Sequence, residues 1–223
     1  MRMRRKKNLD ERLDKCGDMI FRMDRDVKDF SDKSNKQIID IEKMFGRSAP
    51  LILEIGCGKG QFARELAKRE TDKNILAVEK SSNVIVDAAE KTLEEGIQNL
   101  RFARGNAEYL DCFLAEKSVE CIYLNFSCPF PKNTYAAHRL TYVRFLELYK
   151  KILKSGGAIY QKTDNMHFFE FSLEQFSEAG YKLKNVSLDL HNSGFEGNIV
   201  TEYEKMFSDM GKPIYRLEAY LGD

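Results

Sequence analysis

The chain lacks the features that most readily assign a protein to a class. It has five cysteines but no Cys-x-x-Cys pair, so neither a zinc ribbon nor a disulfide framework is indicated. No apolar run approaches the roughly twenty residues of a membrane span, and no apolar signal core follows the basic N-terminus. We therefore expect a soluble, unprocessed protein of the reducing cytoplasm.

An excess of charge of either sign is also missing, since 36 Lys and Arg residues face 35 Asp and Glu residues. No overall field marks the chain as a nucleic-acid binder. The N-terminus differs, because five of its first seven residues are Arg or Lys. Such an arm either contacts phosphates or is a solvated, disordered terminus. His167 and His191 have no metal-ligand companions at suitable spacing, so no metal site is predicted.

Short apolar runs alternate with helical patterns along most of the chain. This alternation predicts an α/β fold with a mostly parallel central sheet built from βαβ units. The expected strands are 51–55, 75–79, 100–103, 121–125 and 158–162. One helix of about ten residues is expected directly after Gly60, and others are expected over 82–96 and 168–179. A further helix over 143–153 is expected to end at Gly156-Gly157. Two more strand-like stretches, 182–190 and 202–207, predict a C-terminal antiparallel hairpin.

The length is compatible with a single domain, which we expect to span residues 1–223. Within it, residues 1–45 are expected to form a basic arm and an extension of one or two helices. Residues 46–223 are expected to form a Rossmann-like core. The extension would pack beside the sheet or cover a cofactor.

The most informative stretch is an apolar strand that carries Glu54 and ends in the pattern Gly56-x-Gly58-x-Gly60. Glycine is needed where the backbone takes a positive φ or where a ligand closely approaches the main chain. The pattern differs from the Gly-x-Gly-x-x-Gly of dinucleotide folds. It resembles the motif with which class I methyltransferases bind S-adenosylmethionine. The alternative is a tight strand-to-helix turn without a ligand.

Two further polar side chains end the next two strands. Glu79 lies nineteen residues past Gly60, where an acid can accept hydrogen bonds from both ribose hydroxyls. Asn106 follows Gly105 and either bonds the adenine edge or forms a turn. Together with the glycines, these residues predict an adenosine-cofactor site at the carboxyl ends of the strands.

A proline-rich stretch, Ser127-Cys128-Pro129-Phe130-Pro131-Lys132, follows the strand 121–125. Two prolines in three positions favour an extended loop, which would fix the directions in which the Phe130 and Lys132 side chains point. An aromatic ring in such a loop can stack on a base, and a lysine can reach a phosphate.

With these elements in place, the chain resembles the bacterial tRNA (guanine-N7)-methyltransferases from about Leu51 to Arg216. Four segments carry the resemblance in order along the chain. They are Tyr123-Leu124-Asn125-Phe126-Ser127 with the proline-rich stretch after it, Arg139-Leu140-Thr141, Lys162-Thr163-Asp164-Asn165, and Thr201-Glu202-Tyr203-Glu204.

The resemblance implies roles for the residues that match the family pattern. S-adenosylmethionine would be faced by Glu54, Gly56, Gly58, Gly60, Glu79, Asn106 and Cys128. The target guanine, which in this family lies in the variable loop of tRNA, would be held by Lys132, Asp164, Thr201, Tyr203 and Glu204. Cys128, which occupies the family's catalytic Asp position, and Asp164 are the candidate catalytic residues.

The chain departs from the family pattern Asp-Pro-Trp-Pro-Lys and the His and paired arginines after it. The Asp is Cys128, the Trp is Phe130, the His is Tyr135 and one Arg is His138. Phe130 and Tyr135 keep an aromatic face, but the change to Cys128 removes a carboxylate. A covalent role for this cysteine would need an activated thiolate and a general base, so a small buried replacement is the simpler interpretation.

Three functions remain open. N7 methylation of tRNA guanine is favoured. Methylation of an exocyclic amine is an alternative, because Ser-Cys-Pro-Phe loosely resembles the Asn/Asp-Pro-Pro-Tyr motif of amine methyltransferases. A non-catalytic or weakly active binder of RNA and S-adenosylmethionine is another, because the family Asp is Cys128. His138, Arg139 and the basic arm are candidate phosphate contacts, and both a monomer and a homodimer are compatible with the sequence.

Overall fold

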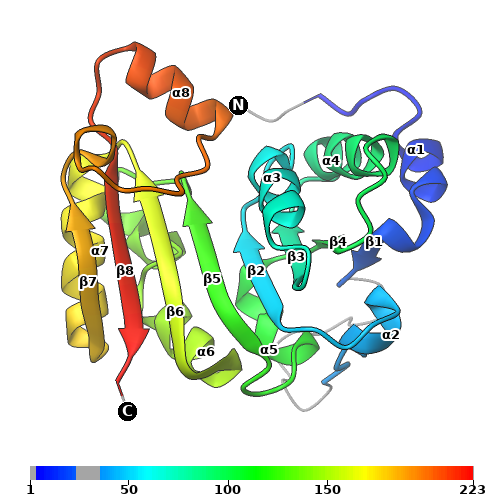
Figure 1. Ribbon diagram of the computed structural model, residues 1–223, viewed down its shortest axis with the longest axis horizontal. Coiled ribbons are helices and arrows are strands. Elements are labelled where there is room, and N and C mark those ends of the chain that lie inside the picture. Colours follow the sequence, from blue (N-terminus) through cyan, green and yellow to red (C-terminus); the bar gives the residue numbers. More distant parts are fainter. Residues whose placement is uncertain (1–3, 24–35, 223) are drawn as a thin grey trace. The chain divides into compact units, whose positions relative to one another are not determined.

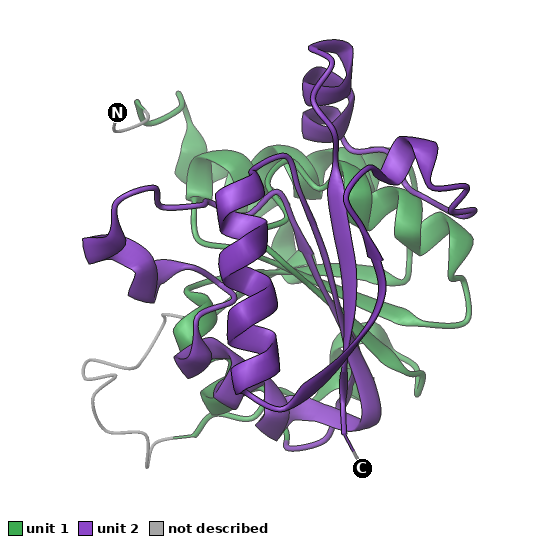
Figure 2. Cartoon of the chain, turned by 90° about the vertical axis from the view of Figure 1, so that its left-hand side faces the viewer, with its two compact units in different colours: residues 1–115 green, residues 116–223 purple. Residues whose placement is uncertain are grey.

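The computed structural model describes residues 4–23 and 36–222. The chain folds into two compact units, residues 1–115 and 116–223 (Figure 2). In each unit, helices pack against strands of a sheet. The expectation of a single domain over residues 1–223 stays a prediction.

The described residues of the first unit form four parallel strands in the order β1-β4-β3-β2 (Figure 1). Their bounds are β1 (Ile20–Arg22), β2 (Leu51–Ile55), β3 (Asn74–Glu79) and β4 (Leu100–Arg104). The register pairs Ile55 with Val78 and Glu79 with Arg104. The carboxyl ends of β2, β3 and β4 therefore lie side by side at one edge of this sheet.

The helices of the first unit are mostly short. They are α1 (Leu9–Lys15), α2 (Ile41–Phe45), α3 (Gln61–Arg69), α4 (Ser82–Glu94) and α5 (Leu110–Phe113), with 3-10 turns η1 (Gly17–Met19) and η2 (Ala107–Tyr109). All five residues of β2 are buried, as a parallel strand covered on both faces requires. The helices expected within residues 10–45 appear as α1 and α2, while residues 24–35 lie outside the described part of the chain.

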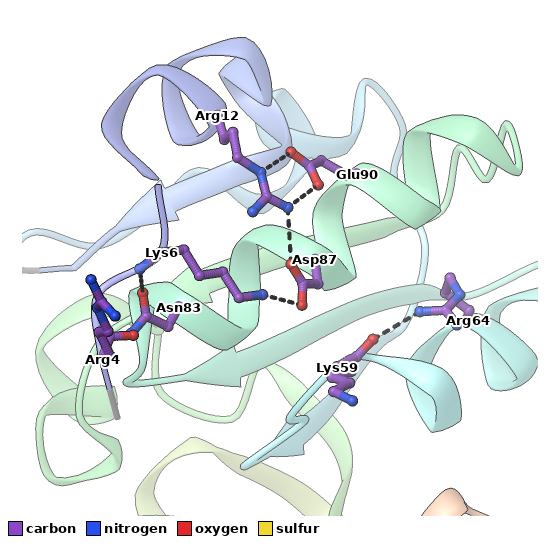
Figure 3. Close-up of polar contacts among 8 residues, drawn as sticks. All are labelled: Arg4, Lys6, Arg12, Lys59, Arg64, Asn83, Asp87 and Glu90. Carbon is purple, nitrogen blue, oxygen red and sulfur yellow. Dashed lines mark hydrogen bonds and ion pairs between the residues drawn. The ribbon is translucent and has the colours of Figure 1, made fainter. Parts of the chain in front are cut away.

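The basic arm lies along α4 from residue 4 onward (Figure 3). The Lys6 backbone N–H donates to Oδ1 of Asn83 at 3.0 Å, and the Lys6 ammonium pairs with Asp87. From α1, Arg12 pairs with Asp87 and Glu90. Two of the N-terminal cations are thus matched by acids of α4. Only residues 1–3 of the arm lie outside the described part.

The second unit contains strands in the order β5-β6-β8-β7 (Figure 1). Their bounds are β5 (Val119–Asn125), β6 (Leu153–Thr163), β7 (Tyr181–Ser187) and β8 (Tyr215–Leu221). β5 and β6 are parallel, whereas β8 runs antiparallel to β6 and β7. The predicted parallel strands with a C-terminal antiparallel hairpin are confirmed. The helices of this unit are η3 (Asn133–His138), α6 (Val143–Ile152), α7 (Met166–Glu178), η4 (Leu190–Asn192) and α8 (Glu202–Asp209).

Two predictions made from local patterns are wrong. The stretch 202–207 is the helix α8, and the second strand of the hairpin is β8. Thr201 caps this helix, because its Oγ1 accepts the backbone N–H of Glu204 at 3.0 Å. The other error concerns α6, which ends at Ile152, so that Gly156-Gly157 lies within β6. A Cβ at Gly157 would be 2.8 Å from the Lys154 carbonyl oxygen, so close backbone packing explains this glycine.

Among the described residues, no helix is long and apolar enough to cross a membrane. The same residues contain no group of three or more His, Cys, Asp and Glu side chains arranged to hold a metal ion.

Candidate active site

In the first unit, the predicted glycines form a turn between β2 and α3, residues 56–60, which we call the glycine turn. Gly56, Gly58 and Gly60 have φ values of 83°, 54° and 71°, a region that favours glycine. The backbone N–H groups of Gly56 and Cys57 both donate to the Val78 carbonyl, at 2.8 and 3.1 Å. These two main-chain contacts bind the start of the turn to the end of β3.

The three glycines have different neighbours. A Cβ at Gly56 or Gly58 would have no heavy atom within 4 Å, so the backbone there is open to an approaching ligand. A Cβ at Gly60 would lie 2.8 Å from the Cβ of Ala88 and 3.2 Å from the ring of Phe102. Gly60 is therefore required for close packing of the turn against α4 and β4.

Glu79 reaches the glycine turn from the end of β3. Its Oε2 accepts the Gly58 backbone N–H at 3.3 Å, and its Oε1 accepts the Ser81 backbone N–H at 2.8 Å. The structure therefore brings together two features that lie far apart in sequence. The neighbouring β4 ends close by, since the Gly105 N–H donates to the Glu79 carbonyl at 3.2 Å.

Two carboxylates, Glu54 and Glu79, act on the glycine turn. Burial raises the pKa of the Cys57 thiol well above its usual range, and the charges of Glu54 and Glu79 raise it further. Glu54 itself is only 2 % exposed. A place where two carboxylates disfavour an anionic thiol is suited to a cationic ligand and unsuited to a pyrophosphate.

Asn106 follows β4 and forms a turn. Its Oδ1 accepts the backbone N–H of Glu108 at 3.4 Å, and its Nδ2 donates to the Glu108 carboxylate. The side chain thereby caps η2 and is exposed. The turn-forming interpretation is confirmed, and the contact with an adenine edge stays a prediction.

In the second unit, the ends of β5 and β6 lie together. Asn125 pairs with Lys162 in the parallel register, and the Phe126 N–H donates to the Lys162 carbonyl at 2.8 Å. Asp164 follows directly after β6, and Asn165 caps α7 by accepting the Phe168 N–H at 2.9 Å. Phe126 and the Lys162–Asp164 motif therefore occupy one edge of this sheet.

Two aromatic side chains of α8 lie against the edge formed by the ends of β5 and β6. The Phe126 ring stacks with Tyr203 and Phe207 at centroid distances of 6.5 and 6.1 Å. The Lys212 ammonium lies 4.7 Å from the centre of the Phe207 ring and 3.3 Å from Oδ2 of Asp164. Tyr203 is 59 % exposed and so presents a ring face to solvent. Sequence reasoning found Asp164 and Tyr203 but assigned no role to the ring of Phe126 or to the side chains of Phe207 and Lys212.

Glu204 has a buried position at the base of α8. Its Oε2 accepts from the Lys162 ammonium at 2.6 Å, and its Oε1 accepts from Asn198 at 2.5 Å and lies 2.8 Å from Nε2 of His191. Lys162 also donates to Oδ1 of Asn198 and to the Ile199 carbonyl, so all three of its N–H donors are used. Burial alone would raise the pKa of Glu204, but the Lys162 charge and the hydrogen bonds outweigh it and lower the pKa.

Thr201 and Glu204 therefore have structural contacts in addition to the substrate role that the resemblance implies. Thr201 is 7 % exposed and caps α8, while the Glu204 side chain is 0 % exposed. The spacing Thr-x-x-Glu is that of a capping box, and it was a local signal for this helix in the sequence. Here the glutamate side chain points to Lys162 instead of back to the cap, which only the fold could reveal.

The loop of residues 127–132, which we call the proline loop, carries Cys128 and Lys132, and both are exposed. The small buried replacement expected for Cys128 is therefore wrong, because the thiol lies at the surface. Phe130, between the two prolines, has a φ of 41°. A non-glycine residue in this region costs about 1–3 kcal/mol, so other contacts must hold the loop.

Arg139 supplies such contacts. It is 8 % exposed, and its Nε and Nη2 donate to the carbonyls of Pro129 and Phe130 at 2.9 and 3.0 Å. Its guanidinium lies 4.3 Å from the centre of the Phe171 ring. Each hydrogen bond from a charged group contributes about 1.5–3 kcal/mol, which is enough to offset the strain at Phe130.

Three residues at which the chain departs from the family pattern lie in contact. The ring of His138 is 5.6 Å from that of Phe130 and 6.1 Å from that of Tyr135. A change in one ring alters the packing of the next. These departures form one local arrangement rather than three unrelated substitutions.

Comparisons with known proteins show what this chain is similar to. Residues 48–217 match a family described as putative methyltransferase. The tRNA (guanine-N(7)-)-methyltransferase of Geobacillus sp. (strain WCH70) is 50 % identical over 176 residues, which cover 79 % of this chain and 80 % of that protein.

Solved structures share the fold at low sequence identity. The 16S rRNA methyltransferase KamB has a TM-score of 0.62 and 14 % identity, over 84 % of this chain and 96 % of its own. A SAM-dependent methyltransferase from Aquifex aeolicus has a TM-score of 0.56 and 15 % identity, over 97 % of this chain and 100 % of its own. These likenesses confirm the predicted Rossmann-like fold.

Proposed function

Because the chain belongs to the family of tRNA (guanine-N7)-methyltransferases, we propose that it transfers a methyl group from S-adenosylmethionine to N7 of a guanine in tRNA. The observation that carries this proposal is the 50 % identity to a tRNA (guanine-N(7)-)-methyltransferase over 79 % of the chain. The polar strand ends of both units lie on segments that the family match includes. We propose that the target guanine lies in the variable loop of the tRNA. We also propose that the reaction takes place in the cytoplasm, where tRNA is available.

The glycine turn and its neighbours fit S-adenosylmethionine, whose sulfonium supplies an electrophilic methyl group when it is bound. Gly56 and Gly58 leave the backbone open, and Glu54 and Glu79 supply the negative field that a sulfonium cation favours. Glu79 would accept from the ribose hydroxyls, in exchange for its present contacts with the Gly58 and Ser81 N–H groups. Asn106 would lie beside the adenine.

N7 of guanine carries a lone pair at neutral pH, so its attack on the methyl carbon requires no prior loss of a proton. In this transfer the N–C bond would form as the C–S bond breaks, and the sulfur would keep the electron pair. Orientation of two reactants supplies about 7–11 kcal/mol of barrier reduction, whereas one positioned acid or base contributes about 10²–10⁴-fold. The exposed Cys128 at the family's Asp position is therefore compatible with activity.

Asp164 is the carboxylate that we assign to the guanine edge. Both oxygens of Glu204 already accept hydrogen bonds inside the second unit. Asp164 contacts Lys212 at 3.3 Å and its side chain is 18 % exposed. A carboxylate there can accept from N1–H and the exocyclic amine and so stabilise the positive charge that develops on the purine. Tyr203 would stack on a base, and Lys132 would reach a phosphate.

The test is methyl transfer to an unmodified tRNA transcript with methyl-labelled S-adenosylmethionine, followed by nuclease digestion and mass analysis. We expect 7-methylguanosine in the variable-loop fragment. Asp164→Ala should abolish the label. Asp209→Ala, which removes an exposed carboxylate from the end of α8, should retain it.

Other products would contradict the proposal in distinct ways. A label on an exocyclic amine would identify an amine methyltransferase. No label, despite measurable binding of S-adenosylmethionine or tRNA, would identify a non-catalytic binder, and Cys128→Asp would then show whether a carboxylate restores turnover.

A further inference from the structure

The proline loop has a backbone shape that its own sequence disfavours. Phe130 has a φ of 41° and stands directly before Pro131. Residues with a Cβ avoid positive φ, and a following proline disfavours helical conformations further. Pro129 and Pro131 also lack backbone N–H groups, so the loop has few donors with which to bind itself. Contacts from outside the loop must therefore set its shape.

Arg139 makes those contacts with a geometry that few side chains can reproduce. Its Nε and Nη2 donate to two successive carbonyls, those of Pro129 and Phe130, at 2.9 and 3.0 Å. The planar fork of arginine spans two acceptors at once, whereas a lysine ammonium offers a single point. The sequence suggested a phosphate contact for this residue, but Arg139 is 8 % exposed and is directed at the loop.

The Arg139 side chain, which contacts the proline loop, also packs against α7. Its guanidinium lies on the ring of Phe171, 4.3 Å from the centre, and that ring stacks on Tyr142 at 6.3 Å. Two residues past Arg139, the fully buried Thr141 is hydrogen-bonded to Ser172 at 2.9 Å. The segment around Arg139 is thus tied to the helix at two adjacent positions. Arg139 thus connects the proline loop to α7.

We propose that Arg139 is a positioning residue, which holds the proline loop in the shape that places Cys128 and Lys132 for methyl transfer. This inference rests on the function proposed above. It gives a role to the Arg139-Leu140-Thr141 segment. It also explains how a strained loop persists without glycine at the positive φ.

The first experiment compares Arg139→Ala and Arg139→Lys with Arg144→Ala. Arg144 is exposed and donates to the Ala137 carbonyl, so its removal deletes the same charge from the same unit. Single-turnover methyl transfer and tRNA affinity are measured across a salt series. We expect both Arg139 variants to slow methyl transfer from the bound state by about 10²-fold, because small misplacements near a reaction have such effects. The salt dependence of tRNA affinity should be unchanged.

A phosphate contact would behave differently. Loss of one phosphate contact lowers the slope of log K against log salt by about one. That result in Arg139→Ala, with an unchanged methyl-transfer rate, would overturn the proposal. Full activity of Arg139→Lys would also overturn it, because lysine keeps the charge without the fork. If Arg139→Ala does not fold, Arg139→Lys decides alone.

A second readout does not require activity. Cys128 is exposed while the other four cysteines are buried, so its alkylation rate reports on the shape of the proline loop. We expect a several-fold change in Arg139→Lys and none in Arg144→Ala. Equal alkylation rates in all three proteins would overturn the positioning role. A changed rate with no turnover in the wild type would support it while contradicting the proposed methyl transfer.

Discussion

The glycine turn of the first unit and the proline loop of the second each follow the end of a strand, yet they are held by different means. In the glycine turn the positive φ values fall on glycine, and two N–H groups of the turn donate to the Val78 carbonyl. In the proline loop the positive φ falls on Phe130, and Arg139, nine residues later, holds the carbonyls.

This difference separates two ways of building a site. The first turn is stable because glycine suits its backbone, and its contacts come from the adjacent β3 and from Arg64 of the following α3. The second unit depends on side chains that come from other elements. Arg139 holds the proline loop, and Lys162 holds α8. We expect substitutions of distant side chains to disturb the second unit's loops and to leave the glycine turn intact.

The largest effect should come from breaking the buried pair of Lys162 and Glu204. Removal of one partner of such a pair typically costs about 3–5 kcal/mol, since the other charge is left buried and unpaired. We expect this loss in Glu204→Leu. The measurement is the free energy of unfolding from urea titration.

The matched control replaces both partners, as Lys162→Met with Glu204→Leu. It leaves no unpaired charge and should recover a large part of the loss. A loss below about 1 kcal/mol in the single variant, the size of an exposed pair, would show that α8 does not depend on this contact.

The next largest loss of stability should come from Gly60→Ala, which tests whether the glycine turn needs a residue without a Cβ at this position. A Cβ at this position combines a positive φ of 71° with a 2.8 Å approach to Ala88. The strain of about 1–2 kcal/mol and overpacking of about 1–3 kcal/mol together predict a loss of about 2–5 kcal/mol. Gly58→Ala has the strain without the clash and should cost less. Equal losses in the two variants, measured by thermal unfolding, would argue against the packing role of Gly60.

Acid should reveal the charged contacts that hold α8. The folded pKa of Glu204 lies below its ordinary value of 4.5. Its stabilising effect is therefore complete above that pH and is lost as the pH falls toward the lowered folded value. We expect the slope of unfolding free energy against pH below 4.5 to be shallower in Glu204→Gln than in the wild type. Parallel curves for the two proteins would mean that other carboxylates account for the acid sensitivity.

The smallest effect should come from Arg64→Met, the counterpart of Arg139 at the glycine turn. Arg64 donates to the Lys59 carbonyl at 2.9 Å and pairs with Glu95. The carbonyl contact from a charged group contributes about 1.5–3 kcal/mol, and the partly exposed ion pair adds at most about 1 kcal/mol. Affinity for S-adenosylmethionine, measured by calorimetry, should stay within about twofold, because glycine already favours the shape of this turn. A tenfold loss would remove the contrast with the proline loop.

The sequence by itself determined those parts of the protein that depend on neighbouring residues. Gly56, Gly58 and Gly60 predicted a strand-to-helix turn because positive φ is a local property of the chain. Glu79 was found by its distance from this turn, since one βα unit has a narrow range of lengths. The methyltransferase fold also followed from ordered local patterns, whereas one strand of the antiparallel end was assigned to the stretch 202–207 instead of to β8.

Only the tertiary structure decided the features that depend on residues distant in the chain. The stretch 202–207 had a cap at Thr201, but the inward direction of Glu204 depends on Lys162 and His191, which come from other elements. Arginine is a residue type that usually lies at the surface, yet the proline loop and α7 enclose Arg139. Whether a charged side chain reaches water or a buried carbonyl is set by what the fold places around it, and local patterns do not carry that information.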